Sequence, residues 1–362
     1  MSYRSQGTAS SRHTHVERVI PVRHSTSVIT AMLSLICLFT LLCGCSRNSA
    51  DAFVIGISIP TQREEGWIRG VNFLRAEATK RGYQVKLQIS DNDATRQLAQ
   101  CENLIAQGVH ILVVAPHDAS AASVIVGKAH RAGIKVISYD RMIKDAPVDL
   151  YLSYDNEKVG ELQGEYIVRK VPKGNYVVLS GAPTDNNAAK FKAGAMKFIQ
   201  PLVEKGEIRI VMEQSVKDWL PAEAMKLVEN ALTSSKNRID AILAPNDGTA
   251  GGAIAALAAQ KLDGKVPVTG QDSEVSAARR IIEGKQSMTV FKDASRLAEQ
   301  TIIAARKLAD GADPGANTTV ANGRYRIPAR LLTPVVVDRN NLEKVLIESG
   351  YLKRSDVAEV GK

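Results

Sequence analysis

The chain has few cysteines and few aromatic residues. The shortage of cysteines restricts the classes of protein to which the chain can belong. Of four cysteines in 362 residues, three lie at or before residue 45 and only Cys101 lies in the rest of the chain. The body of the protein therefore has no framework of intrachain disulfides. Cys101 occurs at helical spacing with Leu98 and Leu104, which predicts a buried apolar side chain. No CxxC or HxxxH pair occurs, so we expect neither a metal centre nor a cofactor.

Basic residues outnumber acidic ones, but they do not gather in one place. The formal net charge is +9, from 47 Lys and Arg against 38 Asp and Glu. Four of these arginines and one glutamate precede residue 45, so removal of that segment would lower the charge by three, to about +6. No Lys/Arg-rich run with interleaved aromatics occurs, and we therefore expect no nucleic-acid partner.

The first 44 residues have the pattern of an export signal. A basic region precedes the mostly apolar stretch Val28–Leu42, which is too short for a comfortable membrane span. The sequence LCGC at 42–45 then resembles the lipobox of bacterial lipoproteins, in which the final cysteine receives the lipid. We expect a signal peptide over 1–44, a lipid on Cys45 and a polar tether over 45–52. A plain signal peptide, an uncleaved anchor and a start at Met32 stay open as alternatives.

Seven short apolar runs each stop abruptly at a polar or charged cluster. They are Val54–Ile59, Ile111–Pro116, Ile134–Tyr139, Tyr176–Gly181, Ile239–Pro245, Val266–Gln271 and Ser287–Phe291. Helical stretches lie between most of them, which predicts an α/β fold with parallel strands. In open α/β sheets, ligands bind in the crevice at the carboxyl ends of such strands.

The residues that follow these runs are suited to hydrogen bonding and include no nucleophile–base pair. Carboxylates accept from hydroxyls, Arg and Lys donate, and amides do both, so the set favours a polyhydroxylated ligand over catalysis. Ordinary structural roles compete with this interpretation, since Asp185 and Asp272 could cap helices and tryptophans are more often core. The segment Gly248–Gly252 lacks the lysine of a phosphate loop. The gathering of so many polar groups at strand ends favours a binding site.

Several motifs resemble those of the periplasmic sugar-binding proteins of the ribose/galactose type, which are substrate-binding proteins of ABC transporters, and especially their xylose-type branch. The motifs lie at Ile137–Ile143 (ISYDRMI), Tyr154–Gln163, Pro183–Ala188 (PTDNNA), Asp218–Pro221 (DWLP), Asn246–Gly252, Gly270–Asp272 (GQD) and Arg330–Pro334. The resemblance extends from Phe53 to about Lys353. It implies a type I periplasmic binding protein fold: two Rossmann-like lobes with parallel sheets, joined by a three-strand hinge.

The resemblance also implies lobe boundaries and ligand contacts. The N-terminal lobe would comprise 53–155 and 293–322, and the C-terminal lobe 156–292 and 323–362. The implied contacts are Arg63, Glu64, Trp67, Asp140, Arg141, Asp185, Asn187, Trp219, Asn246, Asp272 and Lys292. The sequence departs from the xylose-type pattern at Gly66, where an arginine is expected, and at Pro60-Thr61, which is more similar to multi-sugar binders.

The function that the resemblance implies is capture of a monosaccharide, D-xylose in the first place, without enzymatic activity. A monomer in the periplasm or at the cell surface, attached to the membrane through the lipid on Cys45, would deliver the sugar to an ABC transporter permease. The alternative is a multi-sugar (glucose/galactose/arabinose) binding protein that acts as a sensor for a chemoreceptor or histidine kinase. A sugar-responsive repressor would need an N-terminal helix-turn-helix, and residues 1–50 show no such pair of helices.

Overall fold

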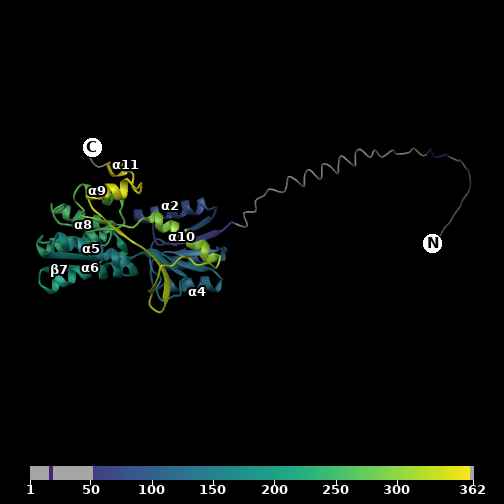
Figure 1. The fold of residues 1–362 in the computed structure, drawn as a ribbon, viewed down its shortest axis with the longest axis horizontal. Helices are drawn as coiled ribbons and strands as arrows, with labels where there is room; N and C mark the ends of the chain where they lie inside the picture. Colours follow the sequence, from purple (N-terminus) through teal and green to yellow (C-terminus); the bar gives the residue numbers. More distant parts are fainter. Residues whose placement is uncertain (1–15, 19–51, 359–362) are drawn as a thin grey trace, which may run out of the picture. The chain divides into compact units, whose positions relative to one another are not determined.

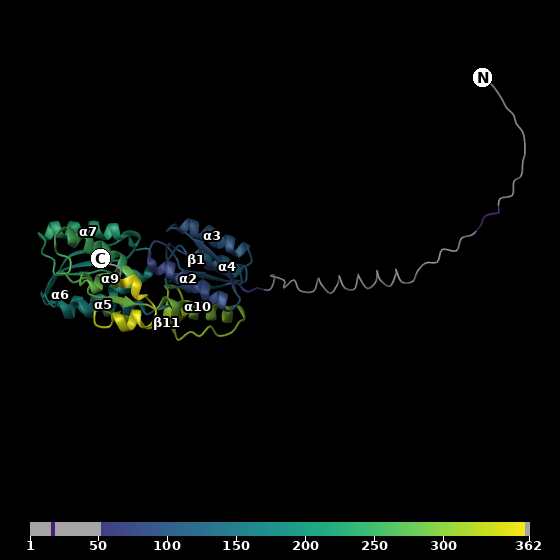
Figure 2. The ribbon, with the colours of Figure 1, turned by 90° about the horizontal axis from the view of Figure 1, so that it is seen from above.

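The computed structural model describes residues 16–18 and 52–358. The expected signal peptide apart from residues 16–18, Cys45 and nearly all of the tether lie outside the described residues. Residues 52–358 form two lobes, each built on a β-sheet with helices on both faces (Figures 1 and 2). Within the described part of the chain, none of the helices has the length and apolar character that crossing a membrane requires.

A seven-stranded sheet forms the centre of the first lobe. Its strands, in spatial order, are β10 (Thr318–Ala321), β11 (Arg326–Leu332), β5 (Leu150–Tyr154), β4 (Lys135–Tyr139), β3 (Ile111–Val114), β1 (Val54–Ile59) and β2 (Gln84–Ile89). All neighbouring pairs are parallel except β10 with β11. The carboxyl ends of β1, β3, β4 and β5 therefore meet at one edge of the sheet.

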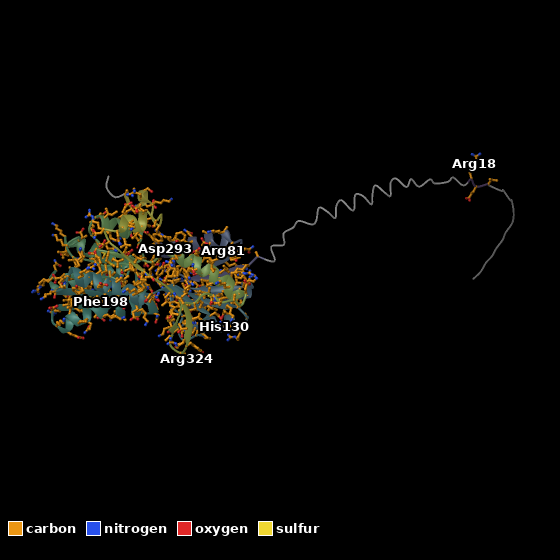
Figure 3. All side chains as sticks on the ribbon, viewed as in Figure 1. Arg18, Arg81, His130, Phe198, Asp293 and Arg324 are labelled. Carbon is orange, nitrogen blue, oxygen red and sulfur yellow. The ribbon has the colours of Figure 1, made fainter. Side chains whose placement is uncertain are left out.

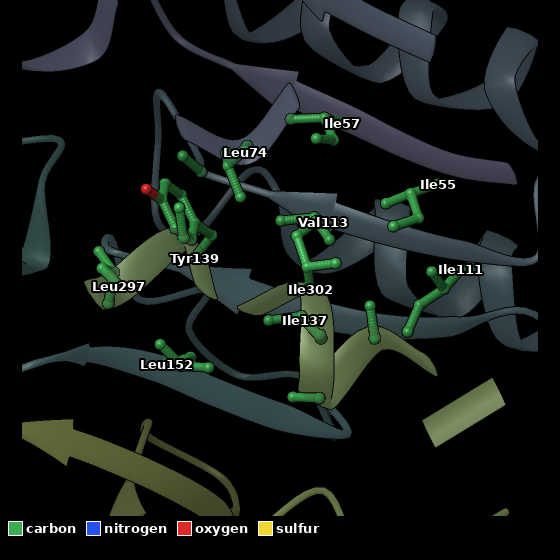
Figure 4. Packing of buried hydrophobic residues seen from close by; sticks show 14 of the residues in the cluster. Ile55, Ile57, Leu74, Ile111, Val113, Ile137, Tyr139, Leu152, Leu297 and Ile302 are labelled. Carbon is green, nitrogen blue, oxygen red and sulfur yellow. The ribbon is translucent and has the colours of Figure 1, made fainter. Parts of the chain in front are cut away.

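Alternating side chains along these strands bury opposite faces of the sheet. Ile55 and Ile57 of β1 pack with α2 (Glu65–Lys80) and α10 (Ala294–Ala309), as Figure 4 shows at close range. On the other face, Leu112 of β3 packs with α3 (Ala94–Ala106) and α4 (Ser123–Arg131). Side chains along a strand point alternately to the two faces of the sheet. Because helices cover both faces, these strands are near-continuous apolar runs.

The second lobe has a smaller sheet than the sequence predicts. Its strands are β7 (Ile208–Ser215), β6 (Gly174–Ser180) and β8 (Ala241–Leu243), in that order and all parallel. One face carries α5 (Asn156–Lys170) and α6 (Asn186–Glu204), and the other carries α7 (Pro221–Ser235) and α8 (Asp247–Ala259). The short helix α9 (Val275–Ile282) packs instead with the tail, which includes η3 (Glu343–Ile347) and α11 (Arg354–Ala358).

Two of the seven predicted strands do not join this sheet as expected. The run Val266–Gln271 makes only an isolated bridge between Val268 and Ile242, next to Pro267, which has no N–H to donate. The run ending at Phe291 forms β9 (Thr289–Phe291), which pairs antiparallel with β12 (Val335–Val337) in a separate two-stranded sheet. Val290 still exchanges backbone hydrogen bonds with Gly270 and Asp272, so the second segment remains attached beside the first.

The chain passes between the lobes three times: at Asp155, at Lys292–Asp293 and at Thr333–Pro334. The expected boundary between 322 and 323 is therefore wrong, because β11 pairs with β5 in the first-lobe sheet. The turn at Asn322 belongs to the hairpin between β10 and β11. Only residues after β11 return to the second lobe.

Hydrogen bonds tie the three crossings together. The Asp155 amide donates to the Leu332 carbonyl at 2.9 Å, and the Tyr154 hydroxyl donates to the Asp293 carbonyl at 3.0 Å. Asp293, labelled in Figure 3, lies at the second crossing. The crossings thus form one connected hinge and share backbone partners.

The helices α5 and α6 approach each other closely through glycines. A Cβ built at Gly194 of α6 would lie 2.1 Å from the Glu157 carbonyl oxygen of α5. The helix α6 also carries Asn187 and Phe191 near its amino end. The contact at Gly194 therefore helps to fix the position of those two side chains at the edge of the lobe.

We predict that Gly194→Ala destabilises the protein by about 1–3 kcal/mol, because the added methyl overpacks a backbone contact. Gly127→Ala in α4 is the matched control: its Cβ would meet only the Arg131 guanidinium, at 3.6 Å, and the variant should gain roughly 0.5–1 kcal/mol from helix propensity. Urea unfolding of both variants checks the pair, and equal stabilities would contradict this account of the helix contact.

Candidate functional site

A cavity lies between the lobes, where the strand ends of the first lobe face the helix starts of the second. The first lobe lines it with Glu64, Gly66, Trp67, Gly70, Tyr139, Asp140, Arg141, Tyr154, Ala294 and Leu297. The second lobe and the tail contribute Asp185, Asn187, Phe191, Trp219, Asn246, Gln271, Asp272, Lys292 and Tyr351. Ten of the eleven predicted contacts therefore line one cavity. The eleventh, Arg63, is exposed and lies outside the lining.

Asp140 lies in a constrained turn directly after β4. Its φ is 58°, in the left-handed region that few residues other than glycine adopt. Its backbone oxygen accepts hydrogen bonds from Ser153 Oγ at 2.6 Å, Tyr151 Oη at 3.0 Å and Asn187 Nδ2 at 3.0 Å. Three donors from both lobes hold this turn, and with it the backbone that carries the Asp140 carboxylate.

Arg141 and Asp185 form a buried ion pair across the lobes. Arg141 Nε lies 2.8 Å from Asp185 Oδ2, and the two side chains are 8% and 3% exposed. The other oxygen of Asp185 accepts from the Asn187 amide at 2.9 Å, so this residue both caps α6 and holds the arginine. Burial raises the pKa of the Asp185 carboxyl, and the Arg141 guanidinium opposes the rise. Arg141 also lies over the Trp67 ring, 5.3 Å from its centroid.

Lys292 is the second buried cation of the cavity. Its Nζ lies 3.0 Å from Asp272 Oδ1 and 3.8 Å from Asp140 Oδ2, with only 11% of the side chain exposed. Burial lowers the pKa of the Lys292 ammonium, but the charges of Asp272 and Asp140 outweigh burial and raise it. The ammonium also lies 5.7 Å from the centroid of the Phe191 ring. Lys292 is therefore a buried positive charge that forms ion pairs with two carboxylates, the closer one being Asp272.

Asp272 and Asn246 line the cavity from the second lobe, the first from a strained backbone position and the second from the start of a helix. Asp272 has a φ of 96°, which a residue with a side chain rarely adopts. Asn246 caps α8, because its Oδ1 accepts from the Thr249 amide at 2.9 Å and from the Thr249 hydroxyl at 2.7 Å. The cap orients the side chain and leaves Nδ2, a donor, without a hydrogen-bond partner among the described residues.

Trp219 forms an aromatic wall of the second lobe. It lies in η2 (Lys217–Trp219), is 5% exposed and packs edge-on against Phe191, with 6.3 Å between ring centroids. Gly181 makes room for the indole, since a Cβ there would lie 2.0 Å from Trp219 Cη2. Trp67 of the first lobe lines the same cavity, which therefore has two indoles, and apolar ring faces suit the C–H face of a sugar ring.

Three polar atoms of the lining are buried and have no hydrogen-bond partner in the described part of the chain. They are Glu64 Oε2, Trp219 Nε1 and Gln271 Oε1. Native proteins rarely leave buried polar groups unpaired, because each costs the desolvation that a hydrogen bond would offset. Two acceptors and one donor around one cavity are typical of a site that a ligand with hydroxyl groups completes.

Several lining residues were not predicted from the sequence. Phe191 lies one turn after Asn187 on α6, so helical spacing from a predicted contact would have found it. Gln271 precedes Asp272 within the GQD motif and was available in the same way. Tyr351 comes from the tail after η3, and no strand-end signal marks it. The cavity carries no nucleophile paired with a base, and the described residues hold no cluster of three metal-ligating side chains.

A family model described as the periplasmic binding protein domain matches residues 55–313. The chain belongs to the periplasmic binding protein family. It is 43% identical over 329 residues to the D-xylose-binding periplasmic protein of Escherichia coli (strain K12), covering 91% of this chain and 99% of that protein. It is 39% identical to a multiple sugar-binding periplasmic receptor of Rhizobium radiobacter, covering 84% of this chain and 92% of that protein.

Solved structures agree with the family and the two-lobe fold. A carbohydrate transporter solute-binding protein from Chloroflexus aurantiacus, in complex with D-glucose, is 36% identical with a TM-score of 0.79. The match covers 83% of this chain and 97% of that one. A solute-binding protein from Clostridium phytofermentans with bound β-D-glucose is 32% identical, also with a TM-score of 0.79, and covers 84% of this chain and 99% of that one.

This periplasmic binding protein also buries two carboxyl groups, those of Asp247 and Glu274, close enough to Asp272 to feel its charge. Asp247 accepts from Gln286 Nε2 at 2.7 Å, from Thr289 Oγ1 at 2.9 Å and from the Glu274 amide at 3.1 Å. Burial and the neighbouring charge of Asp272 raise the pKa of Asp247 to about 7. Burial and the charges of Asp247 and Asp272 raise the pKa of Glu274 to about 9.

We predict that the free energy of unfolding falls as the pH rises from about 5 to about 9. Both folded-state pKa values exceed those of the unfolded chain, so protonation stabilises the fold at low pH, and this is lost as the pH passes about 7 and then about 9. Glu274→Gln should remove the upper part of the decline, whereas Glu348→Gln, at an exposed site, should not. Chemical denaturation at each pH measures this, and a decline unchanged in Glu274→Gln would contradict it.

Proposed function

We propose that this protein is an extracytoplasmic solute-binding receptor that captures a monosaccharide, D-xylose first, between its lobes and delivers it to an ABC transporter permease. One observation carries the proposal. Both lobes contribute carboxylates, cations, amides or indoles to one cavity, and three buried polar atoms of its lining have no hydrogen-bond partner in the part of the chain that the structure describes. A pyranose offers hydroxyls that donate and accept at once, which this set can satisfy.

Contacts between the lobes support a hinge mechanism. Glu65 of α2 accepts from the Val275 amide at the start of α9, at 2.8 Å. Arg69 donates to the Tyr351 carbonyl at 3.2 Å and lies over the Tyr351 ring. Since these contacts form only when the lobes meet, a sugar that binds both half-sites shifts the hinge toward this closed arrangement. The closed lobes would then present a surface to the permease.

The proposal includes the place where the receptor works. The export pattern of residues 1–44 and the cysteine at position 45 support a lipid-anchored monomer in the periplasm or at the cell surface, which binds its sugar without turnover. Uptake of labelled D-xylose by cells lacking the protein separates a transport role from a sensory one. A transport receptor predicts lost uptake, and a sensor for a chemoreceptor or kinase predicts normal uptake.

Isothermal titration with xylose, glucose, arabinose, galactose and ribose tests binding directly. We expect Asn246→Ala and Asp272→Ala each to weaken binding of the best sugar by about 1–3 kcal/mol, because each deletion leaves buried partners unpaired. Arg63→Ala, next to the site but outside its lining, is the control and should bind normally. No binding of any sugar by the wild type would refute the proposal, and unchanged affinity in both variants would remove these residues from the site.

A further inference from the structure

The helix α2 of the first lobe presents one row of side chains to the second lobe. Glu65, Arg69 and Phe73 are spaced four residues apart, which places them on the same face of the helix. Glu65 Oε2 accepts a hydrogen bond from the Val275 amide at 2.8 Å. Arg69 Nη1 donates to the Tyr351 carbonyl at 3.2 Å, and the Arg69 guanidinium carbon lies 4.7 Å from the centroid of the Tyr351 ring. The centroid of the Phe73 ring lies 6.5 Å from that of Tyr351, so the row continues along the helix.

The surface that receives this row consists of α9 and residues 338–358, which we call the tail unit. Ile281 of α9 and Leu346 of the tail are buried in one apolar cluster, and Figure 1 shows the yellow tail beside α9. Arg279 Nε of α9 also donates to the Asp356 carbonyl of the tail at 2.8 Å. The tail unit therefore belongs to the second lobe, and the contacts that it makes with α2 join the two lobes.

Tyr351 is held by its own lobe as well as by Arg69. Its ring packs edge-on against Phe291 of β9, with 4.6 Å between ring centroids. Burial raises the pKa of the Tyr351 phenol to about 12, so the ring is neutral at ordinary pH. Only 20% of the Arg69 side chain is exposed. The contact of Arg69 with Tyr351 is therefore a partly buried hydrogen bond combined with a cation–π interaction.

Glu65 and Arg69 lie outside the lining of the cavity, although Gly66 and Gly70, their neighbours in the chain, line it. A ligand in the cavity is therefore bound by side chains other than these two. The contacts of Glu65 and Arg69 join the lobes beside the sugar site, so they can hold the lobes together whichever sugar is bound.

We propose that Glu65 and Arg69 are positioning residues that latch the closed lobes through the tail unit, and that this latch determines how long a bound sugar is retained. The inference rests on the proposed function and deepens it, because it assigns part of the affinity to a contact outside the sugar site. A contact made only in the closed form stabilises every sugar complex by the same free energy, so it changes all affinities by one factor. Because the latch forms after the sugar has entered, its loss raises the dissociation rate and spares the association rate.

Stopped-flow fluorescence and titration calorimetry test the latch with each of the five sugars named above that the wild type binds. Arg69→Ala should raise the dissociation rate about 3-fold to 30-fold, as expected for the loss of one hydrogen bond and one cation–π contact, and should leave the association rate within a factor of about 2. Arg69→Lys keeps the charge without the planar guanidinium and should lie between Arg69→Ala and the wild type. Glu65→Ala should raise the dissociation rate about 3-fold to 10-fold. All sugars should weaken by the same factor in each variant.

Arg75→Ala is the matched control, because it removes an exposed arginine from the same helix, and it should keep the wild-type rates. Without sugar, the midpoint of thermal unfolding of Arg69→Ala should stay within about 2 °C of the wild type, because the latch is made only by the closed form. In a Tyr351→Leu background, Arg69→Ala should raise the dissociation rate by a smaller factor, since the ring that it contacts is already gone.

Unchanged dissociation rates in both Arg69→Ala and Glu65→Ala would overturn the inference and leave the proposed function standing. So would sugars that weaken by clearly different factors in Arg69→Ala, or a full effect of Arg69→Ala in the Tyr351→Leu background. A fall in the unfolding midpoint without sugar beyond that range would also overturn it, because Arg69 would then support the fold of its own lobe. A wild type that binds no sugar would instead overturn the proposed function itself.

Discussion

The structure depends on how charges are neutralised between the two lobes. Arg141 of the first lobe and Asp185 of the second are both almost fully buried, and each would be costly to bury alone. Lys292, at the second crossing, likewise holds Asp272 of the second lobe and approaches Asp140 of the first. Each lobe therefore supplies charges that neutralise charges of the other, and the ion pairs across the lobes form only when the lobes meet.

This constraint also suits the site to binding. Apart from Glu64, its carboxylates are paired with cations or held by helix caps and constrained turns, as Asp185 and Asp140 show. Such groups accept hydrogen bonds from a ligand at little cost in reorganisation, since their positions are set in advance. The polar atoms of the lining that have no hydrogen-bond partner among the described residues include Glu64 Oε2, Trp219 Nε1, Gln271 Oε1 and Asn246 Nδ2.

The α/β class and most of the cavity followed from the sequence, for a physical reason. Buried parallel strands are short apolar runs, and the polar residues that end them must gather at one edge, which is how Asp140 and Asn246 could be predicted together. The motif resemblance supplied contacts that lie on helices, such as Asn187 at the start of α6. That α6 packs closely on α5 through Gly194 became visible only in the structure.

What the sequence did not disclose depends on long-range pairing. The strand β11 joins β5, about 175 residues earlier in the chain, and no local signal distinguishes that partner from the second-lobe sheet. Val266–Gln271 has the composition of a strand, yet Pro267 limits it to a bridge. Tyr351 reaches the cavity from the tail through contacts with Arg69 and Phe291. Each of these depends on where distant segments meet.

The most direct test of the account uses its two tryptophans. The chain has two, Trp67 and Trp219, and both line the cavity, one from each lobe. Intrinsic fluorescence should therefore change saturably when D-xylose is titrated into the purified protein, and the change should shrink in both Trp67→Phe and Trp219→Phe. A spectrum that stays constant with D-xylose and with every other monosaccharide tried would contradict the claim that this cavity is a sugar site.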